Sequence, residues 1–145
     1  MRLDEASLSH WGERVGKTLE PPVLIGLRGP LGAGKSTLAR AIGRGAGVRQ
    51  PMPSPSFNLL FRYQARLGIE VVHLDLYRLR SPDELWELGW ADLGADNEIV
   101  LVEWPERAGP LMPPDHWLIE LSIPRGEPSR RDVGVERVGH PPDLV

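Results

Sequence analysis

The sequence predicts an α/β domain with a central, mostly parallel sheet flanked by helices and with antiparallel strands near the C-terminus. Apolar runs alternate along the chain with segments of helical periodicity. Some runs, such as EIVLVEW at residues 98–104, are apolar at consecutive positions, as expected for strands buried on both faces. The 145 residues suit one domain. We therefore expect residues 1–145 to form a single domain, with a loose tail over about the last ten residues.

The first part of the chain predicts a helix, a strand and a second helix. In DEASLSHWGERVGKTL, apolar residues recur at steps of three and four, which predicts a helix over residues 4–19. The prolines at 21 and 22 end it. VLIGL predicts a short strand over residues 23–27, and a glycine loop follows. A second helix begins at about Lys35, and we expect it to be ended by the glycines at 43, 45 and 47.

The remainder predicts strands separated by one more helix. FNLLFRY and IEVVHLDL, at residues 57–63 and 69–76, are expected strands. SPDE at residues 81–84 is typical of a helix start, with Ser81 as cap and Glu84 closing a capping box, and the helix should reach Gly89. EIVLVEW, WLIELSI and RDVGVERV then predict three strands, of which the last two close the chain.

Composition excludes several classes of site. The chain has no cysteine, which rules out disulfides, and its four histidines lack the spacing of a zinc site. The first ten residues carry acids and no apolar signal core, so we expect a cytoplasmic protein. No apolar run approaches the length needed to cross a bilayer. With a formal net charge of −3, binding to DNA or a membrane is not expected.

The stretch GPLGAGKST, residues 29–37, contains the pattern G-x-x-x-x-G-K-[ST] between a predicted strand and a predicted helix. Glycines let backbone N–H groups converge on phosphate oxygens, and the helix directs its positive end at the same anion. Lys35 can reach the β- and γ-phosphates, and Ser36 can ligate Mg²⁺. The motif predicts a P-loop NTPase fold, with nucleotide contacts from Gly29, Gly32, Ala33, Gly34, Lys35, Ser36 and Thr37.

Two carboxylates end predicted strands, Asp75 after VVHL and Glu103 after IVLV. The carboxyl ends of parallel strands are where ligands bind in such sheets. One carboxylate would hold the metal directly or through water, and the other would orient the attacking water. The spacing of Asp75 and Glu103 in the sequence does not show which of them holds the metal and which orients the water. Lys35, Asp75 and Glu103 are therefore the candidate catalytic residues, and Ser36 and Glu103 the candidate metal ligands.

Three stretches, GPLGAGKST, SPSF with HLDLYRL, and LVEWPE, resemble the TsaE (YjeE) family over roughly residues 4–131. The resemblance implies a weak Mg²⁺-dependent ATPase that binds ATP or ADP and is needed for threonylcarbamoyladenosine on tRNA. It also implies docking on a TsaD–TsaB complex, with tRNA contacted only indirectly. Pro30 replaces the acid usual in the family at that position.

The resemblance also assigns roles to single residues. Glu103 resembles the metal-ligating acid, and Trp104 matches a tryptophan needed for function. Ser54 and Ser56 fall in a switch-like segment. Arg130, in an uncertain register, corresponds to an arginine that contacts the nucleotide. Asp4 or Glu5 corresponds to a residue near the base.

Other interpretations of the residues stay open. The phosphate loop also suits a small kinase that phosphorylates a metabolite, although residues 79–97 are short and acidic for a lid. A nucleotide-gated binding module without hydrolysis is a further alternative. Among the remaining residues, we expect His73 to be a core histidine, and Trp11, Trp86 and Trp117 to lie in the core because they fall on apolar periodicities.

Overall fold

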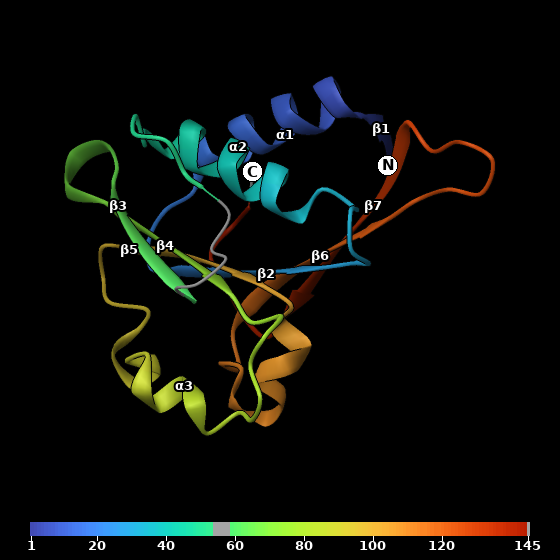
Figure 1. Cartoon of the computed structure of the whole chain (residues 1–145). Coiled ribbons are helices and arrows are strands. Elements are labelled where there is room, and N and C mark those ends of the chain that lie inside the picture. Colours follow the sequence, from blue (N-terminus) through green and yellow to red (C-terminus); the bar gives the residue numbers. More distant parts are fainter. Residues whose placement is uncertain (54–58, 145) are drawn as a thin grey trace.

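The computed structural model describes residues 1–53 and 59–144. Within these residues it forms one seven-stranded sheet with the order β1-β7-β6-β2-β5-β4-β3 (Figure 1). The strands are β1 (Arg2–Asp4), β2 (Val23–Arg28), β3 (Leu60–Gln64), β4 (Glu70–Asp75), β5 (Glu98–Glu103), β6 (His116–Ser122) and β7 (Arg130–Val138).

The four central strands, β6, β2, β5 and β4, are parallel, and β1, β7 and β3 pair antiparallel at the two edges. Helices α1 (Glu5–Thr18) and α2 (Lys35–Ala46) cover one face, as Figure 1 shows. The other face carries α3 (Glu84–Glu87) and the 3-10 helices η2 (Trp90–Asp92) and η3 (Pro105–Leu111), while η1 (Arg66–Gly68) lies in the β3–β4 turn. The predicted α/β class with a mostly parallel centre is confirmed.

The alternation of side chains along the central strands divides the core into two layers. Ile99 and Leu101 of β5 pack on the side of α1 and α2. Val100 and Val102 pack on the opposite side, against Trp90 and the elements around it. Runs that are apolar at every position are therefore buried on both faces, as predicted from EIVLVEW.

Helices α1 and α2 approach each other closely because a glycine of each helix lies against the backbone of the other. A Cβ added to Gly16 would lie 2.0 Å from the carbonyl oxygen of Ile42. A Cβ added to Gly45 would lie 2.1 Å from the carbonyl oxygen of Glu13. The two glycines thus set the distance between the helix that follows the phosphate loop and its neighbour.

Several local predictions were wrong. Residues 2–4 form β1, which the sequence did not suggest, because their pairing partner β7 lies at the other end of the chain. Gly43 and Gly45 lie inside α2, and only Gly47, at φ 106°, ends it. The predicted helix over 81–89 is reduced to the short α3, where Glu84 accepts from the Arg80 N–H rather than from Ser81. Trp86 is 52% exposed and not in the core.

The C-terminal residues also differ from the expected loose tail. Leu144 is only 8% exposed and belongs to the core layer under α1. The indole Nε1 of Trp117 donates to the carbonyl oxygen of Pro142, at 2.7 Å. These contacts hold residues 139–144 against the sheet.

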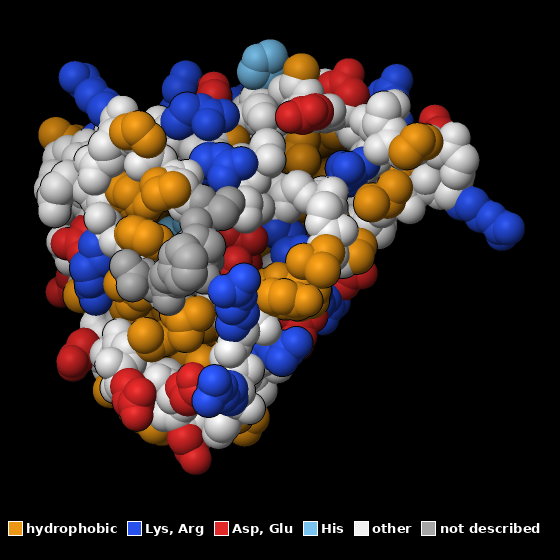
Figure 2. Space-filling view, viewed as in Figure 1, with side chains coloured by type: hydrophobic (Ala, Val, Ile, Leu, Met, Phe, Trp, Pro, Cys, Tyr) orange, Lys and Arg blue, Asp and Glu red, His pale blue; other side chains and the backbone are white. Residues whose placement is uncertain are grey.

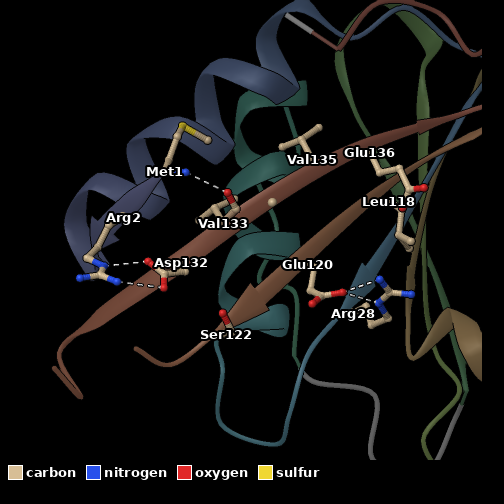
Figure 3. A pocket seen from close by; sticks show the side chains of 11 residues that line it. Met1, Arg2, Arg28, Leu118, Glu120, Ser122, Asp132, Val133, Val135 and Glu136 are labelled. Atoms are coloured by element: carbon tan, nitrogen blue, oxygen red, sulfur yellow. Dashed lines mark hydrogen bonds and ion pairs between the residues drawn. The ribbon is translucent and has the colours of Figure 1, made fainter. Parts of the chain in front are cut away.

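The face of β6 and β7 that is turned away from α1 and α2 is polar, and it lines a cavity of about 690 Å³ (Figure 3). Arg28 pairs with Glu120, and Arg2 pairs with Asp132, on this face. Antiparallel sheet regions commonly face water on one side. No helix within the described residues is long and apolar enough to cross a membrane.

Candidate functional site

The phosphate loop connects β2 to α2 in the setting that its motif requires. Gly32 and Gly34 take φ values of 78° and 100°, which favour glycine. A Cβ at Gly29 would lie 2.4 Å from the carbonyl oxygen of Leu121 on β6. The first N–H groups of the 12-residue helix α2 have no partner within the helix, so this end attracts anions.

Lys35 is buried and turned back onto its own loop. Its Nζ donates to the carbonyl oxygens of Gly29 and Pro30, at 2.7 and 2.8 Å. The same Nζ lies 4.3 Å from the centre of the Trp104 ring. Burial lowers the pKa of Lys35, and the nearby carboxylates of Glu103 and Asp75 oppose that shift. The ammonium group is thus held where an incoming phosphate can replace the two carbonyl acceptors.

Ser36 and Glu103 meet directly across the loop. The Ser36 hydroxyl lies 2.9 Å from Oε1 and 3.0 Å from Oε2 of Glu103. Glu103 is only 2% exposed, and its carboxylate also contacts Nε2 of His73, at 2.6 Å. A hydroxyl and a carboxylate are the hard oxygen donors that Mg²⁺ prefers, and phosphate and water commonly complete its coordination. The chemistry of this pair fits Mg²⁺ carried by a nucleotide.

Asp75 stands beside Glu103 because β4 and β5 are parallel and in register at these residues. Its carboxylate accepts a hydrogen bond from the backbone N–H of Tyr77, at 3.0 Å. Burial raises the pKa of Asp75; the Tyr77 hydrogen bond opposes this, and the charge of Glu103 adds to it. Both predicted strand-end acids therefore face the phosphate loop.

A cavity of about 300 Å³ opens between the loop and the strand ends. It brings together most of the residues that the sequence singled out, namely Gly32, Gly34, Lys35, Ser36, Thr37, Asp75, Glu103 and Trp104. Two predicted loop residues lie outside its lining: Gly29 contacts Lys35 through its carbonyl oxygen, and the side chain of Ala33 is buried.

Trp104 leaves the sheet at this edge in a left-handed backbone conformation, at φ 59°. Its N–H donates to the carbonyl oxygen of Leu27, which ties the end of β5 to β2. The Tyr77 ring packs against it at a tilt of 42°, with ring centres 5.0 Å apart, and also lines the cavity. Tyr77 is not among the residues predicted from the sequence, although its place two residues after Asp75, past the carboxyl end of a strand, is a usable signal.

Arg131, and not Arg130, approaches the phosphate loop. Its Nε donates to the carbonyl oxygen of Ala33 at 2.9 Å, and its terminal nitrogen to that of Gly32 at 3.3 Å. Arg130 is exposed and pairs in register with Asp4 of β1. Neighbouring residues of a strand point to opposite faces, so a register error of one residue moves the guanidinium to the wrong side.

A second cavity of about 510 Å³ adjoins the loop on the side of α1. Asp4 and Glu5, expected near a base, line it together with Thr37 and Arg131. Asp4 also accepts the Ser7 N–H, which caps α1 and lowers the pKa of Asp4.

Ser54 and Ser56 of the predicted switch segment lie outside the described residues. Among the residues that are described, no group of three or more histidine, cysteine or acidic side chains is arranged to hold a metal ion. A metal at Ser36 and Glu103 would thus need ligands from the nucleotide.

Comparison with known proteins gives consistent matches. A family model described as "Threonylcarbamoyl adenosine biosynthesis protein TsaE" matches residues 3–133. The tRNA threonylcarbamoyladenosine biosynthesis protein TsaE of Treponema pallidum is 32% identical, over 79% of this chain and 84% of that protein. The protein of the same name from Haemophilus influenzae is 33% identical, over 81% and 77%. The crystal structure of YdiB from Bacillus shares the fold, with a TM-score of 0.73 at 23% identity over 96% of this chain and 84% of that one.

Proposed function

This chain belongs to the TsaE family and has its role in tRNA threonylcarbamoyladenosine biosynthesis, and within that role we propose that it binds ATP with Mg²⁺ and hydrolyses it. The observation that carries this proposal is the contact between Ser36, at the start of α2, and Glu103, at the end of β5. It places a hydroxyl and a buried carboxylate beside a lysine and a helix N-terminus. These are the parts with which P-loop proteins bind a metal–triphosphate.

Each side chain then has a task in phosphoryl transfer. Lys35 exchanges its two carbonyl acceptors for phosphate oxygens, and Ser36 and Glu103 hold Mg²⁺ directly or through water. The ion, when bound, neutralises charge on the phosphates. Asp75, in register beside Glu103, is placed to orient the attacking water.

The second cavity suits the nucleoside part of the ligand. It shares Gly32, Gly34 and Thr37 with the phosphate cavity, so one ligand can reach both. Asp4 and Glu5, which line this cavity, offer hydrogen-bond acceptors. We assign the phosphates to the first cavity and the base and sugar to the second.

Hydrolysis is tested by comparing Glu103→Gln with Glu120→Gln, a glutamate on the exposed strand face of β6. Glu103→Gln should bind ADP in EDTA within about threefold of wild type and lose about 100-fold in single-turnover hydrolysis, because the carboxylate that holds Mg²⁺ is removed. Glu120→Gln should hydrolyse like wild type. Unchanged hydrolysis by Glu103→Gln would remove this acid from the reaction. No hydrolysis by wild type, even with partners present, would favour a nucleotide-gated binding module.

We further propose that the nucleotide state controls docking on a TsaD–TsaB complex and that tRNA is contacted only through those partners. The formal net charge is −3, and Figure 2 shows basic and acidic side chains interspersed on the face in view. A surface that holds RNA on its own would instead gather cations. Pull-down of TsaD and TsaB with ATP, ADP or no nucleotide, with tRNA probed alongside, tests both points. Equal capture in all three states would contradict nucleotide control.

A further inference from the structure

His73 lies in the middle of β4, is fully buried, and contacts the candidate metal ligand Glu103. Its Nε2 is 2.6 Å from Oε2 of Glu103. In the parallel register, His73 faces Leu101 and Asp75 faces Glu103, so His73 and Glu103 are diagonal neighbours on the face turned toward α2. The sheet itself therefore sets this contact, in which an Nε2–H group donates a hydrogen bond to the ionised carboxylate, since that carboxylate can only accept.

The contact makes the two oxygens of Glu103 unequal. The Ser36 hydroxyl is almost equidistant from them, at 2.9 and 3.0 Å, and so does not select either. His73 contacts only Oε2. His73 thereby holds the carboxylate through Oε2, and Oε1 stays available to contact Ser36 and a ligand in the cavity.

The other ring nitrogen supports a role beyond packing. Nδ1 of His73 is buried and has no hydrogen-bond partner among the described residues. An unpartnered buried polar atom is unfavourable, and the structure retains it in a strand whose other central residues are apolar. The Nε2 contact is the one hydrogen bond recorded for the His73 side chain within the described residues.

We propose that His73 is a positioning residue: it fixes the rotation of the Glu103 carboxylate so that Oε1 faces the bound Mg²⁺. This inference rests on the proposed role of Glu103 and extends it to a residue that does not touch the nucleotide. Partners of this kind, behind a metal ligand, commonly change metal affinity by 10- to 100-fold when removed, as an order of magnitude.

The test compares His73→Gln, His73→Asn and His73→Leu. The glutamine amide nitrogen reaches about the place of Nε2, whereas the asparagine amide reaches only that of Nδ1. The readout is the Mg²⁺ concentration that gives half-maximal tightening of a fluorescent ADP analogue, relative to binding in EDTA. The leucine and asparagine variants should need about 10- to 100-fold more Mg²⁺. The glutamine variant should restore the wild-type value, and binding in EDTA should stay within about threefold in all of them.

His116→Leu is the matched control. His116 is a buried histidine at the start of β6, and its ring contacts the carbonyl oxygen of Pro113. Its loss should lower thermal stability without changing the Mg²⁺ requirement. If the leucine variant does not fold, the comparison of His73→Asn with His73→Gln still decides the test. These two side chains carry the same amide and differ by one methylene in length.

Two further measurements separate this inference from the proposed function. His73→Leu added to Glu103→Gln should cause no additional rise in the Mg²⁺ requirement, because the histidine acts through that carboxylate. In metal-free protein, the Nε2-bound proton of His73 should resonate far downfield by NMR and move upfield in Glu103→Gln.

Failure of each idea gives a different result. If Glu103→Gln raises the Mg²⁺ requirement and His73→Leu does not, His73 has no positioning role. If wild type shows no Mg²⁺-dependent binding, the proposed function fails and the positioning role fails with it. If the ring proton is unaffected by Glu103→Gln, the hydrogen bond itself is absent and the inference is overturned.

Discussion

The ammonium group of Lys35 lies 4.3 Å from the centre of the Trp104 ring, which joins the phosphate loop to the end of β5. Lys35 also donates to the carbonyl oxygens of Gly29 and Pro30, so the side chain is engaged on both sides. A bound phosphate would compete for the same ammonium group. The environment of Trp104 should therefore report nucleotide binding.

Trp104→Phe should abolish most of the change in tryptophan fluorescence on addition of ADP. The expected change arises because Lys35 moves relative to the Trp104 ring when it contacts phosphate. Trp86→Phe, at an exposed tryptophan on α3, is the control and should retain the change. A full response from Trp104→Phe would show that this contact does not alter on binding.

Lys35→Met should weaken ADP binding by about 10- to 150-fold, the loss expected for hydrogen bonds to a charged group. Methionine keeps the apolar part of the side chain and removes the charge. Lys17, at the exposed end of α1, is the other lysine of the chain, and Lys17→Met is the natural control. Titration calorimetry measures both. Similar losses for the two variants would indicate a general charge effect.

Arg131→Ala should weaken ADP binding about tenfold, because its guanidinium holds the carbonyl oxygens of Gly32 and Ala33. Arg130→Ala should bind like wild type. Comparing the two variants tests which face of β7 is turned toward the phosphate loop. A larger loss in Arg130→Ala would restore the assignment made from sequence.

Asp75→Asn should raise the melting temperature at pH 7 in EDTA. Burial raises the pKa of Asp75 above its ordinary 3.8, so the folded chain holds this proton more tightly than the unfolded chain does. The free energy of unfolding then falls as pH rises from that ordinary value through the raised one. Asparagine does not ionise, so it avoids this fall in the free energy of unfolding. Its side-chain oxygen still accepts a hydrogen bond from the Tyr77 N–H.

The advantage of Asp75→Asn should shrink as the pH is lowered and vanish well below 3.8, where the wild-type carboxyl is protonated in both the folded and the unfolded state. Thermal unfolding at several pH values checks this, with the exposed Asp83→Asn as control. A stability difference that does not depend on pH would contradict the explanation.

Gly16→Ala should destabilise the chain by about 1–3 kcal/mol, the usual cost of an overpacked contact. On propensity alone, alanine would stabilise a helix. Here its Cβ would fall 2.0 Å from the carbonyl oxygen of Ile42, so α2 must move, and ADP binding should weaken with it. Gly134→Ala, where a Cβ meets nothing within 4 Å, should have little effect in the same denaturant titration.

The sequence by itself determined the features that depend on neighbouring residues. The phosphate loop is one contiguous motif, so the amino-acid order is enough to place its strand, its glycines, Lys35 and Ser36. Asp75 and Glu103 could be placed at strand ends because an apolar run stops at each of them. Three separate stretches resemble one family, and this resemblance linked the phosphate loop to the segments that contain Asp75 and Glu103.

Only the tertiary structure decided how distant segments meet. Ser36 and Glu103 are 67 residues apart, and their contact depends on the place of β5 beside β2. The choice between Arg130 and Arg131 depends on the pairing of β7 with β1 and β6, since a strand alternates its faces at every residue. The contact of His73 with Glu103 depends in the same way on the register of β4 and β5. Local patterns specify an element and its ends, but the pairing that selects a face is set by long-range packing.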